Sequence, residues 1–258
     1  MRTLGLIGDQ RASDLLKEFL DDSTVKVAQE LVSFVDDWSQ ISVIRQHVEE
    51  DGLLPISIPR KLHDLNSLSK LTNLTSLYLS GTEVSNVSAL ANLTNLTELN
   101  LSRTQVSDIS VLANLTNLAQ LDISNTQVSN ISVLADLTNL TVLGLFLTKV
   151  SDVSVLANLT NLTELYLCRT QVRDVLALTK LTNLKELDIS QTQVSDISSL
   201  ANLTNLTLLN LSNTQVSDVS PLANLINLTE LNLSNTQVSD VSPLANLTNL
   251  KIYQSVRA

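Results

Sequence analysis

The sequence predicts an α/β repeat solenoid built around a parallel sheet, and three observations lead to this fold class. The chain has 258 residues, and 54 of them are Leu. From residue 75 to residue 250 it divides, without insertions, into eight units of 22 residues. Each unit contains two apolar residues separated by one other residue, as in Leu77 and Leu79. A fixed period of this kind indicates stacked repeats that share one continuous core.

The apolar pair predicts one short strand in each unit, because successive side chains of a strand point to opposite faces. Stacked units bring these strands side by side in a parallel sheet. Behind the strand, the apolar residues between Val84 and Leu96 recur mostly at every third position. That spacing favours short 3₁₀ turns over a long α-helix. We therefore expect a solenoid with a parallel sheet on one side and short turns behind it.

The two ends of the chain depart from the period. Residues 1–52 do not repeat, and the apolar positions of "RASDLLKEFLDDSTVKVAQELVSFVDDW" predict two helices that cap the first strand. Residues 53–74 are expected to form a degenerate first repeat. Residues 251–258 are expected to form a partial ninth repeat, with Tyr253 and Ser255 at its two core positions. These features favour a piece of a longer protein, or a chain whose ends are covered by a partner.

The charge and the single cysteine restrict the partners and the compartment. The formal net charge is -10, from 16 basic and 26 acidic residues. Phosphate backbones and anionic lipids are repelled by such a chain, so no nucleic-acid or membrane partner is expected. The first twenty residues are too polar for a signal peptide, and no run of about 18 apolar residues could span a membrane. With only one cysteine, the chain is predicted to be cytoplasmic.

Two polar columns recur as regularly as the apolar ones. Thr follows the strand in all eight units, from Thr82 to Thr236, and Asn recurs from Asn73 to Asn249 in steps of 22. Backbone groups in the turns of a solenoid need hydrogen-bond partners inside the stack. A structural role is therefore predicted for both columns, in preference to a ladder that grips a ligand.

No arrangement of residues predicts nucleophilic catalysis or nucleotide binding. The only histidines, His47 and His63, are about a hundred residues from Cys168, and the five Gly are too scattered for a phosphate loop. We therefore expect no enzymatic activity and no cofactor.

The nearest approach to a catalytic group is a set of three carboxylates. Glu164 and Glu186 occupy the same outward column on neighbouring strands, and Asp188 lies two residues further along. They could bind a hard cation, as in a metal-dependent hydrolase, or form part of a solvated acidic surface. The solvated surface is the preferred interpretation, and no metal site is predicted.

The outward columns differ most from their neighbours in the fourth and fifth units. Here polar or small residues are replaced by apolar, aromatic and basic ones, which define a candidate contact patch of Val142, Phe146, Leu147, Lys149, Tyr166, Cys168, Arg169 and Arg173. An apolar centre with a basic rim is typical of a protein-binding hot spot. Drift in one repeat and a surface for self-association are the alternatives.

The repeat "LxxLxLxxTxVSDVSPLANLTN" resembles the leucine-rich repeat, in the short form of bacterial internalins. One position departs from that family, because Thr stands in all eight units where Asn is usual. The resemblance implies a curved right-handed solenoid with the sheet on its concave face. It also implies a non-enzymatic scaffold that recognises a protein partner through that face.

The string "LGLIGDQRASDLLKEFLDDSTVKVAQELV" resembles a HEAT-type helical hairpin. HEAT-like helices followed by such repeats are similar to the sensor end of bacterial NLR-like signalling proteins, whose nucleotide domain would lie upstream. A free-standing cytosolic adaptor, similar to the leucine-rich regulatory subunits of protein phosphatases, is the competing interpretation.

Overall fold

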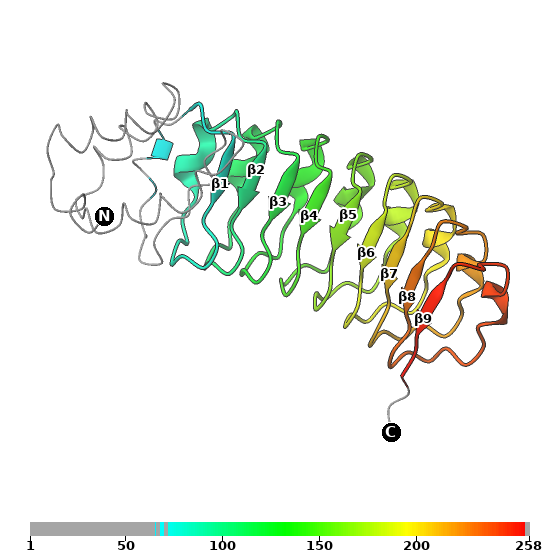
Figure 1. The fold of residues 1–258 in the computed structure, drawn as a ribbon. Coiled ribbons are helices and arrows are strands. Elements are labelled where there is room, and N and C mark those ends of the chain that lie inside the picture. Colours follow the sequence, from blue (N-terminus) through cyan, green and yellow to red (C-terminus); the bar gives the residue numbers. More distant parts are fainter. Residues whose placement is uncertain (1–64, 66–67, 70–71, 256–258) are drawn as a thin grey trace, which may run out of the picture.

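Nine short strands stand side by side in one open parallel sheet, in chain order (Figure 1). The computed structural model describes residues 65, 68–69 and 72–255. Within them the strands are β1 Ser76–Tyr78, β2 Glu98–Asn100, β3 Gln120–Asp122, β4 Val142–Gly144, β5 Glu164–Tyr166, β6 Glu186–Asp188, β7 Leu208–Asn210, β8 Glu230–Asn232 and β9 Lys251–Tyr253. Neighbouring strands from β1 to β8 pair with an offset of 22 residues, as the sequence period predicts.

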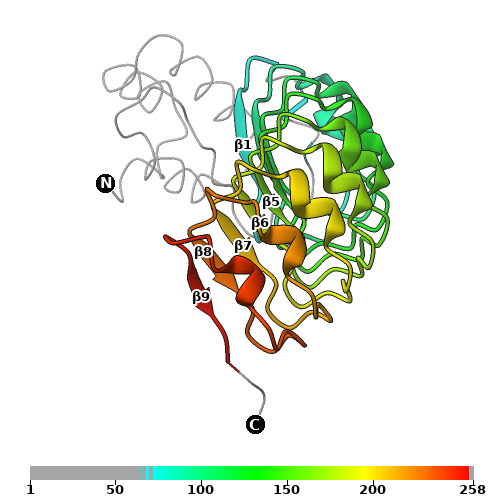
Figure 2. The same cartoon turned by 90° about the vertical axis from the view of Figure 1, so that its right-hand side faces the viewer.

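Short 3₁₀ helices form the side of the solenoid opposite the sheet, which Figure 2 shows to the right of the strands. They are η5 Ser88–Asn92, η6 Ser110–Asn114, η7 Ser132–Asp136, η8 Ser154–Asn158, η9 Leu176–Lys180, η10 Ser198–Asn202, η11 Ser220–Leu222 and η12 Ser242–Leu244. Apolar residues three apart lie on one side of a 3₁₀ helix. The predicted 3₁₀ turns are therefore confirmed.

A single core runs through the stack between the strands and the 3₁₀ helices. Leu143 and Leu145 of the fourth repeat are both 0% exposed, and the equivalent pairs in the other seven repeats are at most 2% exposed. Leu143 lies between Leu121 and Leu165 of the neighbouring strands. The strand alternation predicted from the sequence is confirmed, and the fold is a leucine-rich-repeat solenoid.

The polar columns hold the turns together, as predicted. In each of the eight repeats the Thr hydroxyl donates a hydrogen bond to the carbonyl three residues earlier, for example Thr148 Oγ1 to Leu145 O at 2.8 Å. The Asn amides donate to a Thr carbonyl of the preceding repeat, as in Asn139 Nδ2 to Thr116 O at 2.8 Å. These contacts give both columns a structural role.

The ninth strand does not have the register that the sequence period predicts. Ile252, and not Tyr253, pairs with Leu231 of β8, so the last offset is 21 residues. A one-residue shift moves every side chain of a strand to the other face. Apolar Ile252 consequently packs against the core while Tyr253 is 48% exposed. The expectation that Tyr253 and Ser255 occupy core positions is wrong.

The predicted helical cap, residues 1–52, lies outside the described residues. The same is true of most of the degenerate first repeat, residues 53–74, of which Leu65, Leu68 and Leu74 join the core. Among the described residues no helix has both the length and the apolar character needed to cross a bilayer.

Candidate functional site

The predicted contact patch centres on two adjacent strands. Val142 of β4 pairs with Glu164 of β5, and Gly144 pairs with Tyr166. Val142 and Tyr166 are half-buried on the strand face, which is the face opposite the 3₁₀ helices. The patch residues of these strands therefore lie about one strand spacing apart, roughly 4.8 Å.

Phe146 and Arg169 form the part of the patch just beyond the strands. The guanidinium carbon of Arg169 is 5.8 Å from the centroid of the Phe146 ring, within the range of a cation–π contact. Arg169 Nε donates to Gln191 Oε1 of the next repeat at 2.8 Å. Phe146 is half-buried, although the sequence places it on the outward face, and the equivalent residues of most other repeats are also half-buried or buried. Arg169 and Phe146 thus present a joint apolar and cationic surface.

The next position along the chain is a left-handed turn in every repeat. Its residues have positive φ in all eight: Gly81, Arg103, Asn125, Leu147, Arg169, Gln191, Asn213 and Asn235. Leu147 has a φ of 54° and is 40% exposed. Gly adopts this conformation freely and Asn tolerates it, whereas residues with bulky apolar side chains are strained there. The sequence alone presents this column as a variable surface position and does not reveal its backbone requirement.

Tyr166 is fixed on the strand face by two carboxylates. Its hydroxyl lies 2.9 Å from Oε2 of Glu164 and 2.9 Å from Oε2 of Glu186. The phenol has one hydrogen, so the two acceptors share it. Burial, these hydrogen bonds and the two negative charges raise the pKa of Tyr166 well above its ordinary value. Glu164 and Glu186 therefore position an aromatic ring.

The carboxylates Glu164, Glu186 and Asp188 were the one set in the sequence that could bind a hard cation. Among residues 65, 68–69 and 72–255, no three His, Cys, Asp or Glu side chains come close enough together to hold a metal ion. The β1–β2 pair repeats the Tyr166 arrangement, since Tyr78 donates a hydrogen bond to Glu98 of the next strand. Burial, this hydrogen bond and the Glu98 charge raise the pKa of Tyr78 to about 12. The tyrosine–glutamate contact is thus a recurrent way of fixing an aromatic side chain on this sheet.

Gly144 leaves a gap in the row of side chains beside Tyr166. Equivalent residues in five other repeats are Asn or Asp, and their side chains accept a hydrogen bond from the backbone two residues on: Asn100, Asp122, Asp188, Asn210 and Asn232. A Cβ at Gly144 would lie only 2.6 Å from Asp122 Oδ1. The absence of a side chain there makes room for the carboxylate of Asp122.

The surroundings of Cys168 disfavour its thiolate form. Burial, together with the charge and hydrogen bonding of Asp188, raises the pKa of its thiol to about 12. A thiolate is needed for reaction with electrophiles. Its position and its pKa suit packing rather than catalysis.

We expect Cys168 to react with iodoacetamide at pH 8 at least about a hundredfold more slowly than free cysteine in the native protein, because little thiolate is present. Mass spectrometry of the alkylated chain measures the rate. The same chain in denaturant, where Asp188 and burial no longer act, should react at the rate of free cysteine. Equal rates in the two states would contradict the buried environment of this thiol.

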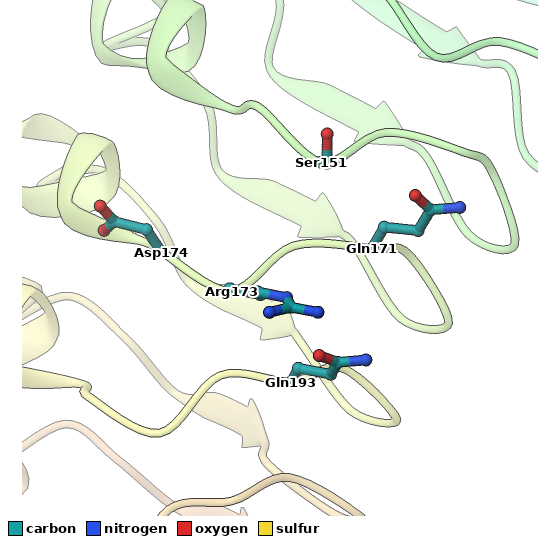
Figure 3. A pocket seen from close by; sticks show the side chains of 5 residues that line it. All are labelled: Ser151, Gln171, Arg173, Asp174 and Gln193. Atoms are coloured by element: carbon teal, nitrogen blue, oxygen red, sulfur yellow. The ribbon is translucent and has the colours of Figure 1, made fainter.

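The basic part of the patch continues around the edge of the sheet. Arg173 lies in a shallow depression of about 350 Å³, with Ser151, Gln171, Asp174 and Gln193 as the other lining residues. Figure 3 shows the Arg173 guanidinium between the side chains of Gln171 and Gln193, while Asp174 points away from it. In the part of the chain that the structure describes, Lys149, Arg169 and Arg173 form no ion pair.

One exposed apolar residue next to this depression is missing from the predicted patch. Leu176, the first residue of η9, is 68% exposed, and the other seven repeats have Ser at its position. The prediction considered mainly the columns around the strand, although the same comparison of columns behind the strand would have found Leu176. Ile226 is also exposed, at 76%, but belongs to the seventh repeat.

Comparison with known proteins places this scaffold in a family. The family described as "Leucine Rich repeats (2 copies)" matches residues 94–136 and 182–224. An internalin C2 (inlC2) from Listeria monocytogenes has 39% sequence identity and a TM-score of 0.69, over 72% of this chain and 84% of that one. The chain belongs to the internalin-like leucine-rich-repeat proteins.

Two further structures show how far this internalin-like similarity extends. An internalin (inlF) from Listeria monocytogenes has 39% identity and a TM-score of 0.73, over 76% of this chain but only 59% of that one. A leucine-rich-repeat protein from Leptospira interrogans has 23% identity and a TM-score of 0.69, over 74% of this chain and 52% of that one. The second similarity concerns the fold alone. A search of curated proteins finds no match.

Proposed function

We propose that this internalin-like chain is a non-enzymatic recognition module that binds a protein partner through the strand face, centred on the contact patch. The observation that supports the proposal best is the partly exposed joint surface of Phe146 and Arg169, with Tyr166 held on the strand face of β5 by two carboxylates. Rigid aromatic and arginine side chains are the usual hot spots of protein interfaces. A plant neighbour with this fold is a peptide hormone receptor solved in complex with RGF2, which suits such a role.

The wider context of the module is also a proposal. The sensor end of a larger signalling protein would use the strand face for the signal and leave catalysis to another domain. A free-standing adaptor would use the same face to regulate an enzyme. The single cysteine of the sequence favours a cytoplasmic setting in either case.

The test uses variants that restore residues already present in neighbouring repeats. Phe146→Ser and Tyr166→Asn together give the face variant, because Ser and Asn occupy these columns elsewhere in the array. The probe is a displayed library of random 12-residue peptides selected on the full chain. Peptides that bind the native chain should bind the face variant at least about 30-fold more weakly, which corresponds to about 2 kcal/mol.

A matched control is Tyr78→Asn, which removes an aromatic ring with the same kind of glutamate contact three strands before β4. Affinity for the selected peptides should change less than about twofold, since hot-spot effects are local. Equal binding of the peptides to the native chain and the face variant would contradict the proposed site.

A further inference from the structure

The departures from the repeat pattern in repeats four and five are not confined to the strand face. They continue from the turn onto the side of the solenoid as a rim band of Leu147, Lys149, Arg169, Arg173 and Leu176. The Arg173 and Leu176 columns are Ser in all seven other repeats, and the Lys149 column is otherwise Gln or Glu. A ligand that touched only the strand face would not account for changes this far around the rim.

The rim band concentrates positive charge on an acidic protein. Only seven Lys and Arg residues lie in the described part of the chain, and three of them belong to the rim band. The other four are Arg103, Lys180, Lys185 and Lys251. The whole chain has a formal net charge of -10. The rim band is therefore a local cationic site that attracts anions, on a protein whose net negative charge repels them elsewhere.

These cations are free to receive an external anion. Arg169 uses Nε for Gln191, which leaves its terminal amino groups available. Arg173 lies between two neutral glutamine side chains, and the nearby carboxylate of Asp174 already accepts a hydrogen bond from the Leu176 backbone. Guanidinium groups bind carboxylates with two parallel hydrogen bonds. The open depression around Arg173 offers room for such a group.

Apolar side chains border the cations at both ends of the rim band. Leu147 is 40% exposed at the turn, and Leu176 is 68% exposed beyond Arg173. Lys149 occupies the same column as Gln171, one strand spacing away, and the chain from Arg169 to Leu176 spans at most roughly 25 Å. An extended segment of about eight residues would cover that distance.

From this placement we propose that an acidic and apolar polypeptide segment of the partner crosses the rim at β4 and β5. Its carboxylates meet Lys149, Arg169 and Arg173, and its apolar side chains cover Leu147 and Leu176. The segment continues from the Phe146 surface onto the side of the solenoid. The inference rests on the proposed function, which it extends to the chemistry and the path of the partner.

The rim variant tests this path by restoring the residues of other repeats. It combines Leu147→Asn, Lys149→Gln, Arg173→Ser and Leu176→Ser, and it keeps Arg169 because that residue also belongs to the surface formed with Phe146. A charge-matched control, Lys180→Asn with Lys185→Thr, also removes two cations and also restores residues found in those columns. The two variants therefore have the same net charge and differ in where the charge is lost.

The probe is again the library of random 12-residue peptides selected on the full native chain. Selected peptides should be enriched in Asp and Glu together with Leu or Phe. Their affinity should fall at least about tenfold in the rim variant and less than about twofold in the charge-matched control. Raising the salt from about 50 to about 500 mM should weaken binding to the native chain more than to the rim variant, since exposed ion pairs are screened.

The outcomes separate this inference from the proposed function. If the face variant loses binding but the rim variant behaves like its control, the partner stays on the strand face and the crossing is wrong. Selection of neutral or basic peptides would also overturn it. Equal binding to all variants would overturn the proposed function as well. Sedimentation of the native chain should give a monomer. If the native chain were a dimer and the rim variant a monomer, the occupant of the rim would be a second copy of the chain, and the proposed partner segment would be wrong.

Discussion

Leu145→Ala is expected to lower the free energy of unfolding by about 2 to 5 kcal/mol, whereas Phe146→Ser should change it by less than about 1 kcal/mol. Leu145 is 0% exposed and lies between the neighbouring strands, so its truncation leaves a cavity in the stack. Phe146 is half-buried, and six of the other repeats have Ser at its position. The backbone N–H of Phe146 donates to Ser124 Oγ at 3.1 Å, a contact that the substitution leaves in place.

Urea unfolding followed by circular dichroism measures both variants. The conservative control is Leu145→Ile, because Ile123 occupies the same column one repeat earlier, and it should cost less than about 1.5 kcal/mol. If Phe146→Ser destabilised the chain as much as Leu145→Ala, Phe146 would be a packing residue. The contact surface around Arg169 would then have a structural explanation.

The contrast between these neighbouring residues shows how much the sequence predicts. Leu143 and Leu145 follow the alternation of a strand, and the period of 22 repeats that alternation on every strand from β1 to β8. Apolar burial is the dominant favourable term in folding, so it can be deduced from the pattern alone. The order of strands and the 3₁₀ turns were predictable for the same reason. The roles of the Thr and Asn columns were predictable because backbone groups in the turns need hydrogen-bond partners.

The candidate site was only partly predictable, because it depends on contacts between side chains. The sequence places Glu164 and Glu186 in one column, which predicts a solvated acidic surface with a cation site as the alternative, but the Tyr166 hydroxyl lies within hydrogen-bond distance of both carboxylates. Which partner a carboxylate takes depends on the reach and orientation of long side chains. The period contains no information about either property. The offset of β9 has a similar origin, since burial of Ile252 overrides the count of residues.

The left-handed turn at Leu147 leads to the second large effect. Leu147→Asn is expected to raise the free energy of unfolding by about 1 kcal/mol, because Asn tolerates positive φ and bulky side chains do not. Three other repeats have Asn at this turn, with φ between 53° and 58°. Urea unfolding again measures the change. Leu147→Ala is the control, and it should bring no gain because alanine retains the Cβ that the left-handed conformation disfavours.

Stabilisation by Leu147→Asn would connect the backbone of the turn with its proposed role. A residue that strains the fold persists where its side chain does something that a relaxed residue cannot do. The same substitution should therefore weaken binding of the selected peptides while it stabilises the chain. Opposite changes in stability and affinity distinguish a contact residue from drift, since a drifted residue would have no affinity to lose. If Leu147→Asn left peptide affinity unchanged, Leu147 would lie outside the interface, and the path over the rim would have to avoid the turn.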